Sequence, residues 1–179
     1  RGWPSSTGCT AGSGCTSWVS SYTWRGAAAG GPRASSPPSR CFRSRASRLR
    51  LMFLLDTNVL SELTRPNPDS GVQRWINQHM AQSGVSTITV FELRWGVAAL
   101  PTGRRQDELL LAIERAINRF GPRLYGFDRL SAEMAGQIGA SSAAQGRPMS
   151  QPDAQLAGIA AVYGLTLVTR NVRDFEASG

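Results

Sequence analysis

Lysine is missing from this sequence, so all twenty basic side chains are arginines. This absence argues against a receiver-like phosphotransfer site, which would need a lysine beside its acidic pocket. Cysteine is missing after residue 41, and the chain has a single histidine, His79. Because zinc sites usually recruit Cys or His side chains, we do not expect a zinc centre. We expect His79 to be a partly exposed helix residue.

Long apolar runs are also missing. No stretch of about 18 apolar residues exists, so we expect no membrane-spanning helix. The first residues lack the apolar segment of a secretory signal. The three cysteines, Cys9, Cys15 and Cys41, have neither CxxC spacing nor a histidine between them, which argues against a zinc or redox pair. The cysteine-free remainder of the chain fits a reducing compartment such as the cytoplasm.

Acidic residues are missing from residues 1–51, which contain eight arginines. That segment therefore accounts for the whole formal net charge of +8. Residues 52–179 carry the other twelve arginines and all twelve acids, so they are formally neutral apart from His79 and the chain end. A basic tail is not a basic folded surface, and total charge therefore gives no argument for nucleic-acid binding.

Residues 1–51 are rich in Ser, Gly, Pro, Ala and Arg and show no periodic apolar pattern. Such a composition buries too little apolar surface to offset chain entropy, so we expect this leader to be disordered or not native. An organelle transit peptide and a basic RNA-binding arm are alternatives. Met52 stands directly before the first clear strand, so we expect translation to begin there. Residues 52–179 then form one domain of ordinary size.

From residue 52 the pattern changes to short apolar runs that alternate with longer amphipathic stretches. We expect strands at 52–55, 85–88, 124–127 and 166–169. Helices are expected at 57–64, 69–81, 90–100, 109–120, 130–144 and 151–163. Strands separated by helices favour parallel pairing. The sequence therefore predicts a three-layer α/β/α sandwich around a central parallel sheet.

Four acids follow or flank the predicted strands. Asp56 comes directly after the first strand, Glu92 follows the second, and Asp174 lies just past the last. Asp153 opens the helix before the last strand. In an open parallel sheet, residues beyond the carboxyl ends of the strands gather along one edge, where ligands bind. The sequence therefore predicts that these acids converge.

Each acid also fits a purely structural role. Asp56 is placed to cap the helix that follows it. Glu92 and Asp153 each lie three residues after a Thr or Ser, which is the spacing of a capping box. Asp174 is placed to close a turn. Taken one at a time, the acids fit these roles as well as they fit a shared site.

Together the four acids are harder to account for structurally, because two like charges about 4 Å apart repel by roughly 4 kcal/mol at an effective dielectric of 20. Three kinds of compensation are open: protonation, a divalent cation, or nearby arginines, for which the candidates are Arg94, Arg170 and Arg173. Clustered carboxylate oxygens suit Mg²⁺ or Mn²⁺ rather than zinc.

Four motifs in the expected order resemble the PIN-domain toxins of the VapC and FitB type. They are LLDTNVLSEL at 54–63, STITVFELRWG at 86–96, PDAQLAGIA at 152–160 and LVTRNVRDF at 167–175. The resemblance covers residues 52–176 and implies the PIN-like form of the α/β/α sandwich. It also implies a metal-dependent endoribonuclease that acts as the toxin of a type II toxin–antitoxin pair.

The resemblance implies which residues form the site. The cation would be Mg²⁺ or Mn²⁺, and its ligands would be Asp56, Glu92, Asp153 and Asp174. Asp56 and Asp153 are expected to bind it directly, and the other two partly through water. Supporting polar residues near the ion would be Thr57, Asn58 and Thr169, and Asn171 would order the loop.

The implied reaction is hydrolysis of an RNA phosphodiester by metal-activated water, with one carboxylate accepting a proton. Phosphate or base contacts are expected from Arg94, Arg170 and Arg173, with Trp95, Arg104 and Arg105 as further candidates. Glu62 is a further acid near the first motif. Because Glu is rarely buried, we expect Glu62 to be an exposed helix charge.

The resemblance also implies partners, namely a cognate VapB-like antitoxin, an RNA substrate and a second copy in a homodimer. Two other functions stay open. One is a catalytically impaired module that binds RNA or the antitoxin. The other is a phosphatase on a similar fold, although such an enzyme would need a second Asp where this chain has Asn58. Family members normally continue into a last strand after residue 175, so we expect that edge strand to be missing and the neighbouring edge to be unpaired.

Overall fold

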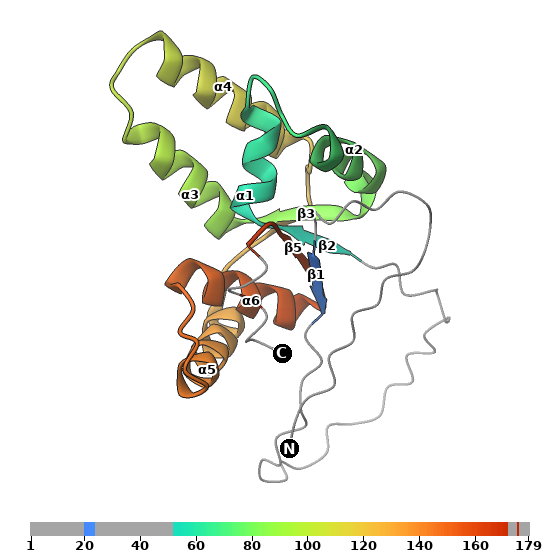
Figure 1. Cartoon of the computed structure of the whole chain (residues 1–179), viewed down its shortest axis with the longest axis vertical. Helices are drawn as coiled ribbons and strands as arrows, with labels where there is room; N and C mark the ends of the chain where they lie inside the picture. The colour runs from blue at the N-terminus through green and yellow to red at the C-terminus, as the bar shows by residue number, and fades with distance from the viewer. Residues whose placement is uncertain (1–19, 24–51, 172–174, 176–179) are drawn as a thin grey trace.

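The sheet in the described part of the chain has five strands in the order β1-β5-β2-β3-β4 (Figure 1). The computed structural model describes residues 20–23, 52–171 and 175. Within the sheet, β5, β2, β3 and β4 are parallel neighbours, whereas β1 runs antiparallel to β5. The strands are β1 (Ser20–Thr23), β2 (Phe53–Leu55), β3 (Ser83–Ser86), β4 (Leu124–Tyr125) and β5 (Thr166–Thr169).

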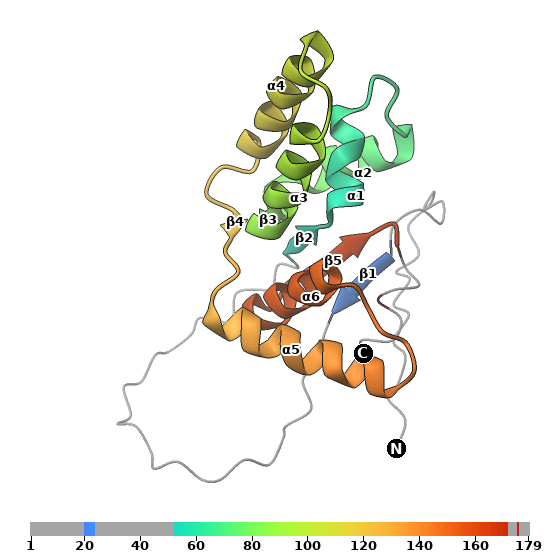
Figure 2. The same cartoon turned by 90° about the vertical axis from the view of Figure 1, so that its left-hand side faces the viewer.

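Helices cover both faces of this sheet. In Figure 1 and Figure 2, α1 to α4 lie on one face, and α5 and α6 lie on the other. This arrangement confirms the predicted three-layer sandwich with a parallel central sheet. The helices are α1 (Thr57–Leu60), α2 (Ser70–His79), α3 (Thr87–Ala98), α4 (Arg104–Asn118), α5 (Arg129–Ala144) and α6 (Gln151–Tyr163), with 3-10 turns η1 (Ser61–Thr64) and η2 (Met80–Gln82). Among the helices of the described residues, none combines the length and apolar character needed to cross a bilayer.

Successive residues of the short strands face opposite layers. Leu55 and Val168 belong to the hydrophobic cluster built with α1 to α4. Leu54 and Leu167 belong to the cluster built with α5 and α6. Because side chains alternate between the two faces of a strand, β2 and β5 each supply both cores. Burial on both faces explains why β2 is apolar throughout and why the middle of β5 has two apolar residues in succession.

The predicted types of β3 and α3 are correct, but both elements begin earlier than predicted. β3 begins at Ser83 and α3 at Thr87, rather than at residues 85 and 90. The Ser86 hydroxyl accepts a hydrogen bond from the Thr89 amide at 2.9 Å, so Ser86 is the N-cap of α3. Thr87 and Ile88 favour strands by side-chain type. The cap nevertheless places both of them in the first turn of the helix.

Strand β1 corrects the expectation that the edge of β5 is unpaired. Residues 20–23 pair with residues 169–166 in antiparallel register. Tyr and Thr favour strands, and backbone pairing satisfies the edge of a sheet. The segment is only four residues long and is surrounded by Ser, Gly and Arg. For this reason no periodic pattern could indicate it.

Helices α5 and α6 pack closely at Gly158. A Cβ built on Gly158 would clash with the backbone oxygen of Ser131 and would lie 2.8 Å from the backbone nitrogen of Ala135. Because backbone atoms cannot move aside alone, Gly158→Ala forces the two helices apart. We expect it to lower the free energy of unfolding by about 1–3 kcal/mol, the range for an overpacked core.

The matched control for this prediction is Gly136→Ala in α5, where nothing lies within 4 Å of the added Cβ. The control gains helix propensity, by about 1 kcal/mol at most. Chemical denaturation measures both variants. A Gly158→Ala protein as stable as the control would contradict the close packing of α5 on α6.

Candidate active site

Asp56 lies at the carboxyl end of β2, in the middle of the sheet. Its backbone amide donates to the Val168 oxygen of β5 at 3.0 Å, which continues the sheet pairing by one residue. Its carboxylate caps α1 and accepts from the Thr57 amide at 2.5 Å. Only 5% of the residue is exposed. The structural role that sequence analysis offered for Asp56, that of a helix cap, is therefore confirmed, but the burial shows that the cap is not an ordinary surface one.

The second carboxylate oxygen of Asp56 binds two further polar side chains. It accepts from the Asn58 amide nitrogen and from the Thr169 hydroxyl, both at 2.6 Å. The Thr169 hydroxyl accepts in turn from the Asn171 amide at 2.9 Å. The structure thus places Thr57, Asn58, Thr169 and Asn171 in one hydrogen-bonded group around Asp56. These are the residues that sequence analysis named as supporting ones.

Glu92 and Asp153 come from two different helices and meet near Asp56. Glu92, on α3, accepts from the Thr57 hydroxyl at 2.5 Å. Asp153, in the first turn of α6, accepts from the Ser150 hydroxyl at 2.5 Å. Both carboxylates act electrostatically on Asp56. Thr57 therefore links Glu92 to Asp56, and Asp153 lies within electrostatic reach of Asp56. The fourth predicted ligand, Asp174, lies outside the described residues.

The capping-box role holds for Asp153 and is wrong for Glu92. Ser150 is the N-cap of α6, and its hydroxyl accepts from the Asp153 amide at 3.3 Å. By contrast, α3 is capped by Ser86, so Glu92 lies beyond the first turn. Glu92 therefore has no capping role, and its carboxylate is available to the site.

Burial raises the pKa of the Asp56 carboxyl to about 6 from its ordinary value of 3.8. The hydrogen bonds from the Thr169 hydroxyl and the Thr57 amide lower this pKa, while the charges of Asp153 and Glu92 raise it. Desolvation and like charges both oppose ionisation. At neutral pH, Asp56 is thus a buried negative charge beside two others.

Two of the three arginines proposed as counter-charges are engaged elsewhere. Arg94 forms an ion pair with Glu114 between α3 and α4. Arg170 forms an ion pair with Glu62. Arg173 lies outside the described residues. Arg94 and Arg170 are therefore paired with other acids, while protonation and a cation both fit the geometry around Asp56.

The donor set is made of oxygens, which suits a hard divalent cation. Within residues 52–171, no group of three or more His, Cys, Asp or Glu side chains lies close enough to hold an ion unaided. Mg²⁺ usually keeps several waters and needs only one or two protein carboxylates. The residues present therefore fit Mg²⁺ or Mn²⁺ with water completing the coordination, and they do not fit zinc.

The raised pKa of Asp56 leads to a prediction about stability in the absence of metal. The folded carboxyl binds its proton more tightly than the unfolded one, so its protonation favours the folded state. This stabilisation is fully present below about pH 3.8 and is lost as the pH rises through about 6. The expected loss is about 3 kcal/mol.

The measurement is the free energy of unfolding in chelator, from pH 3.5 to 7.5, of the wild type and of Asp56→Asn. The variant is the reference that cancels all other titrating groups. We expect the wild type to lose stability relative to the variant as the pH rises. A difference that does not change with pH would contradict the burial of an ionisable Asp56.

Glu62 is buried, and the prediction of an exposed helix charge is wrong. Its side chain is 1% exposed and pairs with both Arg65 and Arg170. Two cations make this burial tolerable, because a buried charge needs paired partners. The spacing of Glu62 and Arg65, three residues apart on one turn, was the sequence signal for the first of these pairs.

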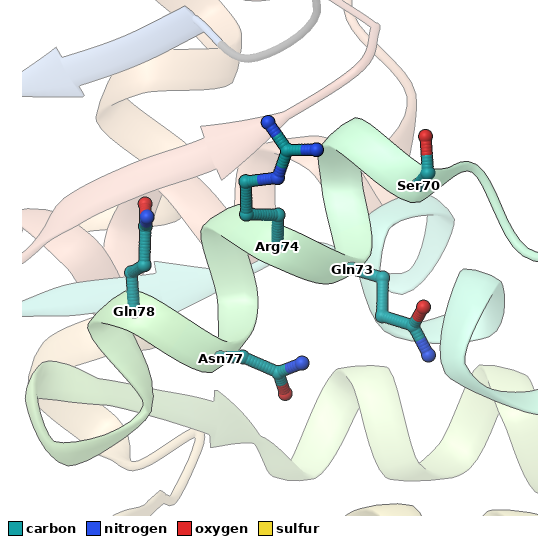
Figure 3. A pocket seen from close by; sticks show the side chains of 5 residues that line it. All are labelled: Ser70, Gln73, Arg74, Asn77 and Gln78. Carbon is teal, nitrogen blue, oxygen red and sulfur yellow. The ribbon is translucent and has the colours of Figure 1, made fainter.

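A separate hollow of about 520 Å³ lies along α2 (Figure 3). It is lined by Ser70, Gln73, Arg74, Asn77 and Gln78. All five side chains come from one helix, and none of them is a carboxylate. The hollow is therefore distinct from the acidic group around Asp56 and does not supply its chemistry.

Comparison with known proteins places this geometry in a family. The PIN domain family matches residues 53–177. The plasmid stability protein StbB of Pseudomonas syringae pv. tomato is 41% identical over 130 residues, which cover 72% of this chain and 94% of that protein. The VapC ribonuclease Y4jK of Sinorhizobium fredii is 34% identical and covers 72% and 93%. Toxin FitB of Neisseria gonorrhoeae is 36% identical and covers 71% and 93%.

A solved structure shows the same architecture. The structure titled FitAB bound to IR36 DNA fragment contains a chain that is 34% identical and superposes with a TM-score of 0.65. The match covers 71% of the present chain and 90% of that one. The part of the present chain outside these matches is largely the leader.

Proposed function

The chain belongs to the PIN-domain family, and from this membership we propose that it is a divalent-metal-dependent endoribonuclease and the toxin of a toxin–antitoxin pair. Relatives that match nearly their whole length carry the names VapC ribonuclease and Toxin FitB. The proposal extends the activity in those names to this chain. It adds that the activity needs Mg²⁺ or Mn²⁺ and that Asp56, Glu92, Asp153 and Asp174 form the site.

One observation carries the metal dependence. Asp56 is almost fully buried, its pKa is raised to about 6, and Asp153 and Glu92 lie close enough to raise it. Like charges that oppose the ionisation of a buried Asp56 also oppose folding at neutral pH, so the metal-free arrangement is costly. A divalent cation bound at Asp56, with water completing its coordination, would offset that repulsion.

The residues of the chain have distinct tasks in this proposal. Asp56 and Asp153 hold the cation, and Glu92 and Asp174 contribute partly through water. A divalent ion held there would activate water for attack on an RNA phosphodiester and stabilise charge on the phosphoryl oxygens. Thr169 and Asn58 fix the orientation of the Asp56 carboxylate through their hydrogen bonds to it. One of the carboxylates accepts the proton of the attacking water.

The proposed RNA contacts are Arg94, Arg170 and Arg173. Arg94 is 42% exposed although it pairs with Glu114, so its remaining donors face solvent. Arg170 is 34% exposed. A guanidinium has five donors and can pair with a carboxylate and a phosphate together.

The proposed protein partners are a cognate VapB-like antitoxin and a second copy of this chain. Three large apolar side chains are more than half exposed on α3 and α4: Phe91, Trp95 and Leu111. The rings of Phe91 and Trp95 lie 5.6 Å apart. Exposed apolar patches mark protein–protein contacts. We propose that Phe91 and Trp95 contribute to a contact with one of these two partners.

The experiment that tests this function is an RNA cleavage assay on the full chain with Mg²⁺, with Mn²⁺ and with chelator. We expect internal cleavage of labelled RNA with either ion and none with chelator. Addition of the cognate antitoxin should suppress cleavage. Equal cleavage in chelator would contradict the metal requirement. Hydrolysis of small phosphomonoesters without RNA cleavage would support a phosphatase instead.

A further inference from the structure

Glu62 is a buried acid that the proposed chemistry does not use. It lies in η1, directly after α1, and its side chain is 1% exposed. The first helical turns after β2 therefore carry two nearly buried carboxylates, Asp56 and Glu62. Asp56 faces the acidic group, whereas Glu62 faces arginines. A buried charge of this kind is costly to keep, so its contacts indicate what it holds in place.

Glu62 joins three segments of the chain. One oxygen pairs with Arg65 at 2.9 Å and with Arg170, which follows β5. The other oxygen accepts from the backbone amide of Asp69, the N-cap of α2, at 3.0 Å. The contact with Arg170 spans 108 residues of sequence. Of the three contacts, it is the one that reaches the end of a central strand beside Asp56.

Arg170 lies next to the residues that orient Asp56. Its backbone amide donates to the Asn58 side-chain oxygen at 3.0 Å. The nitrogen of the same Asn58 side chain donates to Asp56. The residue before Arg170 is Thr169, whose hydroxyl donates to the same Asp56 oxygen. Any movement of Arg170 is therefore transmitted to both side chains that hold this oxygen.

We propose that Glu62 is a positioning residue, which holds Arg170 so that Thr169 and Asn58 keep the Asp56 carboxylate oriented for a divalent cation. This inference rests on the proposed function, because it concerns the same site. Glu62 touches neither the cation nor the substrate. It acts through Arg170, Thr169 and Asn58. Residues that hydrogen-bond to metal ligands change the metal affinity in this indirect way.

Two competing roles for the Glu62–Arg170 pair lead to different experimental results. If Arg170 acts mainly as an RNA contact, loss of the pair raises the KM for RNA and does not change the affinity for the cation. If the pair only stabilises the fold, its loss lowers the global stability and speeds hydrogen exchange uniformly over the protein. A positioning role instead weakens cation binding and loosens the loop at 169–171 locally.

The chain offers a matched set of variants for this test. Glu62→Gln and Arg170→Gln each break the pair. Arg65→Gln is the control, since it removes the other arginine from the same carboxylate but leaves Arg170 in place. Arg170 is one-third exposed and Glu62 retains Arg65 without it, so Arg170→Gln keeps the proposal testable even if Glu62→Gln does not fold.

Two readouts on the full chain need no RNA. The first is the Kd for Mn²⁺, measured by water-proton relaxation, which we expect to rise about tenfold in Glu62→Gln and Arg170→Gln. The second is amide hydrogen exchange in the metal-free protein. In the pair-breaking variants, the exchange rate should increase over that of the wild type more at Arg170 and Asn171 than in the cores of β2 and α6. The control variant should change neither readout.

Three results would overturn the proposal. They are Mn²⁺ binding like that of the wild type in both pair-breaking variants, exchange that rises uniformly over the fold, and a higher KM for RNA with unchanged Mn²⁺ affinity. Failure of the proposed function is a separate result. A wild type that binds Mn²⁺ at Asp56 without cleaving RNA refutes the nuclease and leaves the positioning role standing. A wild type that cleaves RNA while the variants bind Mn²⁺ normally refutes only the positioning role.

Discussion

Replacing Asp56 by Asn lowers metal-dependent RNA cleavage by about a hundredfold to a thousandfold, the range for loss of one electrostatic group in an active site. The amide cannot supply the negative charge that a divalent cation needs at this position. Asn is nevertheless as good an N-cap as Asp, so α1 keeps its cap. The variant should therefore be folded, and in chelator at pH 7 it should be more stable than the wild type.

Loss of cleavage together with a gain in stability would show that Asp56 serves a cation site and is not only a helix cap. The matched control is Asp128→Asn, which makes the same substitution at the N-cap of α5, where the side chain accepts from the Ser131 amide. The control should keep wild-type cleavage. Rates of RNA cleavage at saturating Mg²⁺ measure both variants. If Asp56→Asn cleaves RNA as fast as the control, Asp56 is only a cap.

Asp153→Asn is expected to lower cleavage by about a hundredfold, because it removes the second direct contact with the cation. The structure offers a sharp control for this acid, since its helix is capped by a different side chain. Ser150 provides the N-cap of α6, and the Asp153 carboxylate only accepts a hydrogen bond from the Ser150 hydroxyl. Ser150→Ala should cost about 1 kcal/mol of stability and should change cleavage much less than Asp153→Asn does.

The two variants of α6 are compared by thermal denaturation and by cleavage rate. Loss of stability without loss of cleavage in Asp153→Asn would show that this carboxylate serves the helix rather than the cation. A Ser150→Ala protein that loses cleavage and keeps its stability would also contradict the assigned roles. The expected outcome is that stability follows Ser150 and activity follows Asp153.

The sequence was sufficient to predict the sandwich and the place of Asp56. Both follow from patterns among residues that are close together in the sequence. Leu54 and Leu55 form a buried strand, and an acid directly after such a strand must lie at the edge of a parallel sheet. The polar residues around Asp56 followed from the resemblance of the motifs. Helix α6 was predicted with its observed bounds, because Ser150 and the glycine after Tyr163 mark its two ends.

The environment of Glu62 could not be predicted. Its partner Arg170 is 108 residues away in sequence, and no periodic pattern links residues at that distance. The general rule that Glu is exposed therefore gave the wrong result. The pairing of Arg94 with Glu114 was not predicted for a similar reason, since it depends on how α3 packs on α4.

Strand β1 was missed because backbone pairing, rather than side-chain pattern, defines it. Four residues beside β5 satisfy the edge of the sheet wherever they come from in the sequence. The start of α3 was missed because a single hydroxyl, that of Ser86, outweighs the strand preference of the residues that follow. Both differences come from hydrogen bonds that composition does not encode.

The most direct measurement of the proposed site is anomalous diffraction from crystals of the full chain grown with Mn²⁺. A cation site at Asp56 requires one manganese peak at a distance of about 2.1 Å from a carboxylate oxygen of this residue, with Asp153 beside it. The peak should vanish in Asp56→Asn. An ordered Asp56 without a manganese peak, in a protein that cleaves RNA at the same Mn²⁺ concentration, would contradict a cation site built on this carboxylate.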